Sequence, residues 1–175
     1  HLMQGPVPIE SLKTTGFTRA IIKSLIQKSI VGPTQLPIMS HQIIKTIENA
    51  LTLNNEQRIA VDAIKKELHH YHGFLLDGIT GSGKTEVYLQ VMETVLLQGR
   101  QVLFLVPEIG LTPQLLARFK KRFHVPMAVI HSHLTEKERQ SAWTQAHFNE
   151  AKLIIGTRTA VCTSMPSLGL IAIDE

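Results

Sequence analysis

The chain reads Gly78-Ile79-Thr80-Gly81-Ser82-Gly83-Lys84-Thr85 between a short apolar run and a strongly helical stretch. This is a complete P-loop pattern, and a strand predicted over 73–77 and a helix over 85–98 give it the required strand–loop–helix setting. The glycines let backbone N–H groups converge on phosphate oxygens at the positive end of the helix. Lys84 is expected to reach the β- and γ-phosphates, and Thr85 to bind Mg²⁺. The pattern therefore predicts a nucleoside triphosphate site, since chance matches mostly lack both flanking elements.

The composition indicates a globular protein of modest size. The chain has 175 residues, 43% hydrophobic and 18% charged, which suffices for one ordinary domain and an appendage. The longest apolar runs have the length of a strand, so we expect no membrane partner. A net charge of +4 and a pI of about 9.3 mildly favour polyanionic partners. His1-Leu2-Met3 resembles a cloning remnant rather than a secretion leader, and the single Cys162 fits the reducing cytoplasm of a bacterium.

Residues 4–31 differ in pattern from the rest of the chain and predict a small helical module. Thr18 can cap a helix with one apolar face, and Gly32-Pro33 is expected to end it. The apolar face consists of Ile21, Ile22, Leu25, Ile26 and Ile30. Together with a shorter helix around 9–12, this pattern predicts a helix-turn-helix within a winged-helix-like segment.

The polar face of the same predicted helix carries a basic stripe. Arg19 and Lys23 are four residues apart, so both side chains project from one side of the helix. One interpretation is a surface that binds DNA, and the other is an ordinary solvated face; a charge stripe alone does not decide between them. Residues 32–52, which contain Pro33 and Pro37, are expected to form a linker to the second region.

Residues 53–175 alternate between helical and strand patterns. The expected order is a helix after Asn54 or Asn55, strand 73–77, helix 85–98, strand 101–106, a helix from Pro113, strand 128–131, a helix capped by Thr135 and Glu138, and strands 152–156 and 170–174. Near-continuous apolar strands separated by helices predict an α/β fold with a parallel sheet covered on both faces. Phosphate ligands then belong at the carboxyl ends of the strands.

Two acidic residues follow the last predicted strand. A P-loop ATPase holds Mg²⁺ with a carboxylate at the end of a hydrophobic strand, and Asp174 stands in that position. Glu175, one residue later, is expected to orient or deprotonate the attacking water. An acidic terminus without a role is the alternative, but the pairing with a P-loop about 90 residues upstream favours catalysis.

Five blocks of sequence extend beyond the bare P-loop pattern. They are Gly-Ile-Thr-Gly-Ser-Gly-Lys-Thr-Glu-Val-Tyr-Leu (78–89), Val-Pro-Glu-Ile-Gly-Leu-Thr-Pro-Gln (106–114), His-Ser-His-Leu-Thr (131–135), Gly-Thr-Arg-Thr-Ala-Val (156–161) and Leu-Gly-Leu-Ile-Ala-Ile-Asp-Glu (168–175). In these blocks the chain resembles superfamily 2 DNA helicases, most closely the bacterial primosomal replication-restart helicases. The resemblance covers residues 53–175 strongly and 5–31 weakly. It implies a RecA-like P-loop NTPase lobe preceded by part of a winged-helix domain.

The resemblance assigns roles to residues outside the P-loop. Gln57, after Glu56, matches the glutamine motif that reads adenine, and a side-chain amide can pair with adenine N6 and N7. A polar helix start is the alternative. Two further motifs are implied to hold the DNA backbone. They comprise Thr112, Pro113, Gln114, Gly156, Thr157, Arg158 and Thr159. Backbone N–H groups at a helix start and the Arg158 guanidinium suit phosphate contacts, which position a strand without reading its sequence.

The resemblance also implies an activity for the intact protein. It would use ATP and Mg²⁺ to move 3′ to 5′ along single-stranded DNA, unwind forked DNA and assemble the primosome with replication-restart proteins at stalled forks. The family's second RecA-like lobe with its arginine finger, its zinc-binding cysteines and the end of its Asp-Glu-Glu-His signature are absent from these 175 residues. We therefore expect this fragment to bind nucleotide but to hydrolyse it weakly. A winged-helix DNA-binding protein with a regulatory ATP switch is the alternative, and a nucleotide-only kinase is a third.

Two smaller features depart from these motifs or compete with them. Cys162 stands where the resembled family usually has an aromatic residue, and the loop 164–166 is a loose version of the usual one. His131 and His133 could ligate a metal ion, but one cysteine and the lack of spaced partners favour ordinary surface histidines.

Overall fold

The computed structural model describes residues 16–28, 30–32, 51–79 and 81–174. The chain divides into two units, residues 1–41 and 42–175, and each is described here by itself. The helix predicted around 9–12 and most of the predicted linker lie outside the described residues. The predicted domain boundaries therefore stay predictions.

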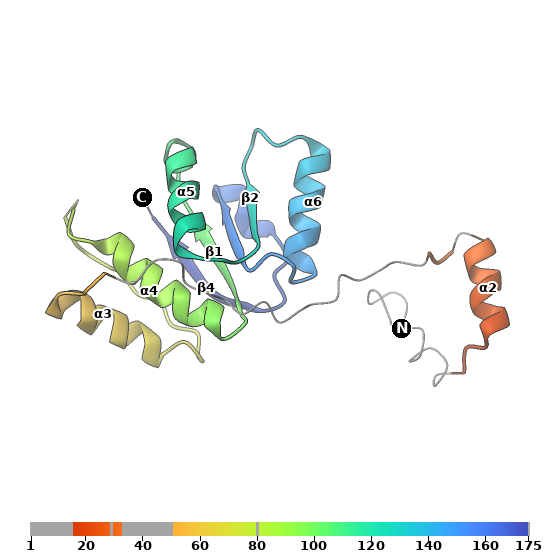
Figure 1. Ribbon diagram of the computed structural model, residues 1–175, viewed down its shortest axis with the longest axis horizontal. Helices are drawn as coiled ribbons and strands as arrows, with labels where there is room; N and C mark the ends of the chain where they lie inside the picture. The colour runs from red at the N-terminus through yellow and green to blue at the C-terminus, as the bar shows by residue number, and fades with distance from the viewer. Residues whose placement is uncertain (1–15, 29, 33–50, 80, 175) are drawn as a thin grey trace. The chain divides into compact units, whose positions relative to one another are not determined.

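Helix α2 (Arg19–Gln27) belongs to the first unit (Figure 1). Thr18 caps it as predicted, because its hydroxyl accepts a hydrogen bond from a backbone N–H of the first turn at 3.4 Å. The helix ends earlier than predicted, five residues before Gly32. The physical reason is a closing hydrogen bond of 3.0 Å from the Ile30 N–H to the Leu25 carbonyl, which ends the last turn before the glycine is reached. No residue of α2 is buried.

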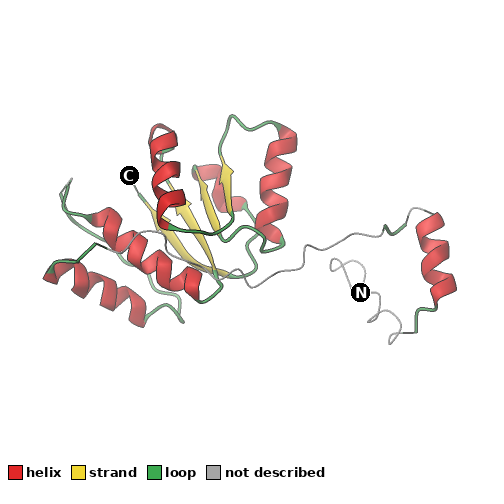
Figure 2. Ribbon diagram, viewed as in Figure 1, coloured by secondary structure: helices red, strands yellow, loops and turns green. Residues whose placement is uncertain are grey.

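A parallel sheet forms the centre of the second unit, as the sequence predicts (Figure 2). Its strands are β1 (Gln101–Leu105), β2 (Met127–Ile130), β3 (Leu153–Gly156) and β4 (Leu168–Ile173). They lie in the order β2-β3-β1-β4, so β1 pairs with β3 on one side and with β4 on the other. Every pairing is parallel, which places all four carboxyl ends at one edge of the sheet.

Helices connect and cover the strands. They are α3 (Asn55–Lys66), α4 (Lys84–Leu97), α5 (Pro113–Arg122) and α6 (Glu136–His147), with the short 3₁₀ helices η2 (Glu108–Gly110) and η3 (Arg158–Cys162). The predicted capping box of Thr135 and Glu138 is present at α6, and Asn54 forms a second one at α3. Gly99 follows α4 with a φ of 74°, a left-handed conformation that suits glycine after a helix.

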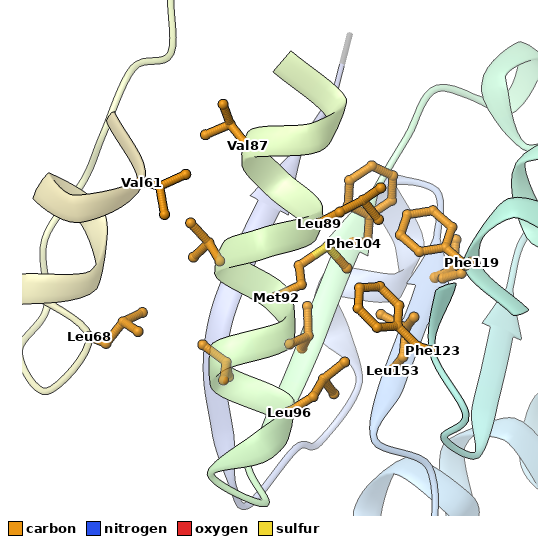
Figure 3. Close-up of a cluster of buried hydrophobic side chains, with 14 of the residues drawn as sticks. Val61, Leu68, Val87, Leu89, Met92, Leu96, Phe104, Phe119, Phe123 and Leu153 are labelled. Carbon is orange, nitrogen blue, oxygen red and sulfur yellow. The ribbon is translucent and has the colours of Figure 1, made fainter. Parts of the chain in front are cut away.

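The sheet separates two hydrophobic cores because side chains alternate between the faces of a strand. On one face Val102 and Phe104 pack with α3, α4 and α5. On the other face Leu103 and Leu105 pack with α6 and η3. Figure 3 shows the first core between α3, α4, β1 and α5, where Phe104 and Phe119 make an edge-to-face contact with ring centroids 4.9 Å apart. The first core holds α4 in place, and with it the loop that leads into it.

The strand predicted over 73–77 is not formed. Residues 71–79 run as an irregular segment and pair with none of the described strands. Leu75 is 95% exposed and Phe74 is 45% exposed, and of this run only Leu76 packs against the core. A short apolar run becomes a strand only where it pairs with another strand, and residues 73–77 do not pair with the outer edge of β4.

Candidate nucleotide site and nucleic-acid face

The P-loop enters α4 through two glycines in the left-handed conformation. Gly81 has a φ of 86° and Gly83, the N-cap of α4, a φ of 85°. Glycine adopts such angles at little cost, and they turn successive N–H groups toward one side of the loop. The Lys84 ammonium folds back over the loop and donates hydrogen bonds to the Gly78 carbonyl and, at 3.1 Å, to the Ile79 carbonyl. The Lys84 side chain is thus hydrogen-bonded to carbonyl groups of the P-loop itself.

Gln57 lies against the P-loop. Its side-chain oxygen accepts the Asn54 N–H at 3.0 Å in the capping box, and its side-chain nitrogen donates to the Ser82 carbonyl at 2.8 Å. A β-carbon on Gly83 would collide with that nitrogen. The Gln57 amide therefore does two things at once: it completes the capping box at the start of α3 and it binds the P-loop.

Asp174 faces the helix that carries the P-loop lysine. Its backbone N–H donates to the Leu105 carbonyl at 2.9 Å, which keeps it in register with the sheet. Its carboxylate accepts a hydrogen bond from the Tyr88 hydroxyl of α4. Burial, and then the charge of Asp174 and this hydrogen bond, raise the pKa of Tyr88 above its usual value, so the phenol keeps the proton it donates. Thr85 lies three residues before Tyr88, and such residues are neighbours on a helix surface. The fold thus brings Asp174 to the Thr85 face of α4.

The first predicted DNA motif forms the start of α5. The Thr112 hydroxyl caps the helix by accepting the Leu115 N–H at 3.2 Å, and Pro113 occupies the first turn. Pro113 and Gln114 are exposed. A helix N-terminus with exposed polar groups suits a phosphate contact, because its first N–H groups have no partner within the helix.

The second predicted DNA motif follows β3 and divides into a buried and an exposed half. Gly156 and Thr157 are buried, and a β-carbon on Gly156 would collide with the backbone carbonyl of Ile130. Arg158 and Thr159 are exposed at the start of η3. Leu105 of β1 pairs with Gly156, so the loops after β1 and β3 leave the sheet at the same edge. The buried half anchors the loop, and the exposed half is available to a ligand.

Thr80 and Glu175 lie outside the described residues. Arg19 and Lys23 are exposed on α2 in the first unit.

Two features of the site escaped the sequence analysis. Tyr88 is part of the block at 78–89, but nothing in the spacing shows that its hydroxyl meets Asp174. Glu86 is buried in the first turn of α4 and pairs with Arg122 of α5. A glutamate between apolar residues of a buried helix was the available signal, since acidic side chains are almost never fully buried unless they are paired.

The parallel sheet, the glycine-rich loop before a buried helix and the facing carboxylate define a class, the RecA-like P-loop lobe. The family described as type III restriction enzyme, res subunit, matches residues 50–169, and the chain belongs to this family. The chain is also 49% identical over 167 residues to the replication restart protein PriA of Haemophilus influenzae, which covers 94% of the chain. It is 42% identical over 173 residues, or 95% of the chain, to PriA of Bacillus subtilis. The resemblance inferred from the motifs is confirmed.

The chain is much shorter than these relatives. It spans 22% of the Haemophilus influenzae protein and 21% of the Bacillus subtilis protein. A solved structure described as RecG bound to a three-way DNA junction covers 89% of the chain with a TM-score of 0.62 and 24% identity, while the chain covers 20% of it. That similarity confirms the fold of the lobe.

The described part of the chain contains no helix with the length and apolar character needed to span a membrane. Across the same residues, no three His, Cys, Asp or Glu side chains are grouped to hold a metal ion. The rings of His131 and His133 lie 6.1 Å apart, and the His133 backbone N–H donates to Nδ1 of His131 at 3.2 Å.

Proposed function

We propose that this chain is the first ATP-binding lobe of an ATP-dependent 3′–5′ DNA helicase that acts in replication restart. The observation that carries the proposal is the contact of the Asp174 carboxylate with Tyr88 of α4, the helix that begins with the P-loop lysine. The similarity to PriA proteins over almost the whole chain supports the particular role. We further propose that the intact protein acts at single-stranded and forked DNA with primosome proteins in the bacterial cytoplasm, and that any zinc is held outside these residues.

The residues of the site fit a triphosphate with Mg²⁺. Thr85 and Asp174 offer oxygen ligands of the kind Mg²⁺ prefers, and the start of α4 offers N–H groups to phosphate oxygens. When bound, Mg²⁺-ATP supplies the phosphoryl group that is transferred to water. The Lys84 ammonium neutralises phosphate charge after leaving the Gly78 and Ile79 carbonyls. Gln57 reads adenine, and Glu175 orients the water.

DNA contacts are proposed for the exposed parts of the two motifs at the sheet edge. Gln114 and the start of α5 are exposed after β1, and Arg158 and Thr159 are exposed after β3. Phosphate contacts of this kind position a strand without reading its bases, as a motor that moves along any sequence requires. In related hydrolases an arginine supplied from another domain speeds turnover by roughly 10³- to 10⁵-fold. The isolated chain is therefore expected to bind ATP and hydrolyse it poorly.

The test is the ATPase activity of the full-length protein with and without single-stranded DNA. We expect DNA to stimulate hydrolysis, and Lys84→Ala to abolish it by removing the charge that faces the phosphates. Lys137→Ala, an exposed lysine of α6, is the matched control and should keep the wild-type response. Hydrolysis that does not respond to DNA, with intact nucleotide binding, would refute the motor and support a regulatory switch.

A further inference from the structure

A buried charged cluster joins the P-loop helix to α5. Glu86 is 7% exposed and Arg122 is 4% exposed, although both stand beside a hydrophobic core. One guanidinium nitrogen of Arg122 lies 3.4 Å from a carboxylate oxygen of Glu86 and 3.1 Å from one of Glu93. Glu86 and Glu93 both belong to α4, and Arg122 is the last residue of α5. One cation therefore connects two turns of α4 to the end of the neighbouring helix.

The Glu86 carboxylate is the centre of this cluster. The oxygen that faces Arg122 also accepts the Leu51 N–H at 3.2 Å and the Gln90 side-chain amide at 3.0 Å. The same amide donates to the Leu51 carbonyl at 2.9 Å. Since Glu86 lies two residues after Lys84, a displacement of Arg122 acts directly on the first turn of the P-loop helix.

Stability alone is a weak reason for such a cluster. Burying charges costs desolvation energy, and well-packed apolar side chains often replace a buried ion pair without loss of stability. What a charged cluster adds is a defined geometry, because its hydrogen bonds are directional. Arg122 thus fixes the angle and register at which α5 lies on α4.

The far end of α5 is the proposed DNA motif. The helix has 10 residues and runs as one body from the Thr112 cap, beside exposed Pro113 and Gln114, to Arg122. A short helix with one end held in a core transmits a shift at its other end. The end that would meet a phosphate and the end that meets Glu86 are therefore mechanically connected.

We propose that Arg122 is a positioning residue that couples DNA at the start of α5 to nucleotide at the P-loop, through Glu86 and Glu93. This inference rests on the proposed function. It requires that DNA changes the affinity for nucleotide and, by thermodynamic linkage, that nucleotide changes the affinity for DNA by the same factor. Without Arg122 each ligand still binds, but neither changes the affinity for the other.

The test measures that factor in the full-length protein. A non-hydrolysable ATP analogue with Mg²⁺ is titrated with and without saturating oligo-dT, and the ratio of the two dissociation constants is the coupling. Coupled sites typically give ratios of about 5 to 150. We expect a ratio in this range for the wild type and a ratio near 1 for Arg122→Met, which keeps an apolar stem in the core.

The matched control is Arg118→Met, on the same helix but with an exposed side chain. It should keep the wild-type ratio. A merely structural role of Arg122 would reduce the amount of folded protein, but would leave the ratio of two affinities of the folded fraction unchanged. A wild-type ratio in Arg122→Met would therefore overturn the inference.

A second variant keeps the test decisive if Arg122→Met does not fold. Glu93→Gln removes one partner of Arg122 from a side chain that is 21% exposed, so it disturbs the core less. A coupling ratio clearly below that of the wild type supports the inference, and an unchanged ratio rejects it. A wild-type ratio of 1 would also overturn the inference, because DNA would then not change the affinity for nucleotide. Failure of the proposed function is recognised separately, as ATP hydrolysis that does not respond to DNA.

Discussion

The two candidate ligand regions, the P-loop and the motif after β3, are built in opposite ways. In the P-loop region the side chains expected to meet nucleotide are engaged with the protein: Lys84 bonds to loop carbonyls, and Gln57 bonds to Ser82. In the motif after β3 the buried residues Gly156 and Thr157 fix the backbone, and Arg158 projects into solvent.

This difference indicates how each region would respond to its ligand. We expect a triphosphate to replace the internal hydrogen bonds of the P-loop, so that nucleotide binding rearranges Lys84 and also Gln57, which joins α3 to the loop before α4. A DNA phosphate only has to approach an exposed guanidinium on a fixed loop. We therefore expect substitutions in the P-loop to act through conformation, and substitutions in the second region to act through charge.

The largest effect is expected for Gly83→Ala. Gly83 has a φ of 85°, and its new β-carbon would collide with the Gln57 amide. The left-handed conformation costs a non-glycine residue roughly 1–2 kcal/mol, or about 5- to 30-fold in an equilibrium constant. We expect at least this loss of affinity for a fluorescent ATP analogue, measured by titration. Gly99→Ala, with a φ of 74° and nothing within 4 Å, is the control and should leave nucleotide affinity unchanged. Equal losses of nucleotide affinity in Gly83→Ala and Gly99→Ala would contradict a specific role for the P-loop conformation.

An intermediate effect is expected for Arg158→Ala in the full-length protein. If the exposed guanidinium contacts one phosphate, its loss should lower the slope of log K against log salt for single-stranded DNA by about one. Nucleotide affinity without DNA should not change, because the buried half of the motif still fixes the loop. Lys66→Ala, an exposed residue at the end of α3, removes the same charge as a control. An unchanged slope in Arg158→Ala would show that the Arg158 guanidinium does not contact a DNA phosphate.

The smallest effect concerns the capping box of α6. Hydrogen bonds from the hydroxyl and backbone N–H of Thr135 lower the pKa of Glu138 below its usual value. A carboxyl whose pKa is lower in the folded state adds stability above its unfolded pKa, and this stability is lost as pH falls through the folded pKa. Glu138→Gln keeps an acceptor without titrating, so its melting temperature should depend less on acid pH than that of the wild type. Glu136→Gln, outside the capping box, is the control; melting curves from about pH 3 to 7 decide.

Local chemistry made much of the secondary structure predictable. The caps at Thr18, Asn54 and Thr135 satisfy backbone groups within a few residues, and periodicity gave the parallel strands and the helix after the P-loop. The strand predicted over 73–77 was wrong for the opposite reason, because pairing depends on a neighbour that no local pattern specifies.

By itself, the sequence determined the class of the protein, since a P-loop between an apolar run and a helix has one main use and its geometry is local. Only the tertiary structure decided which distant side chains meet: Asp174 with Tyr88, Gln57 with Ser82, and Arg122 with Glu86. These contacts join residues 25 to 86 positions apart in the chain, and their partners are set by how helices pack on the sheet rather than by any spacing along it.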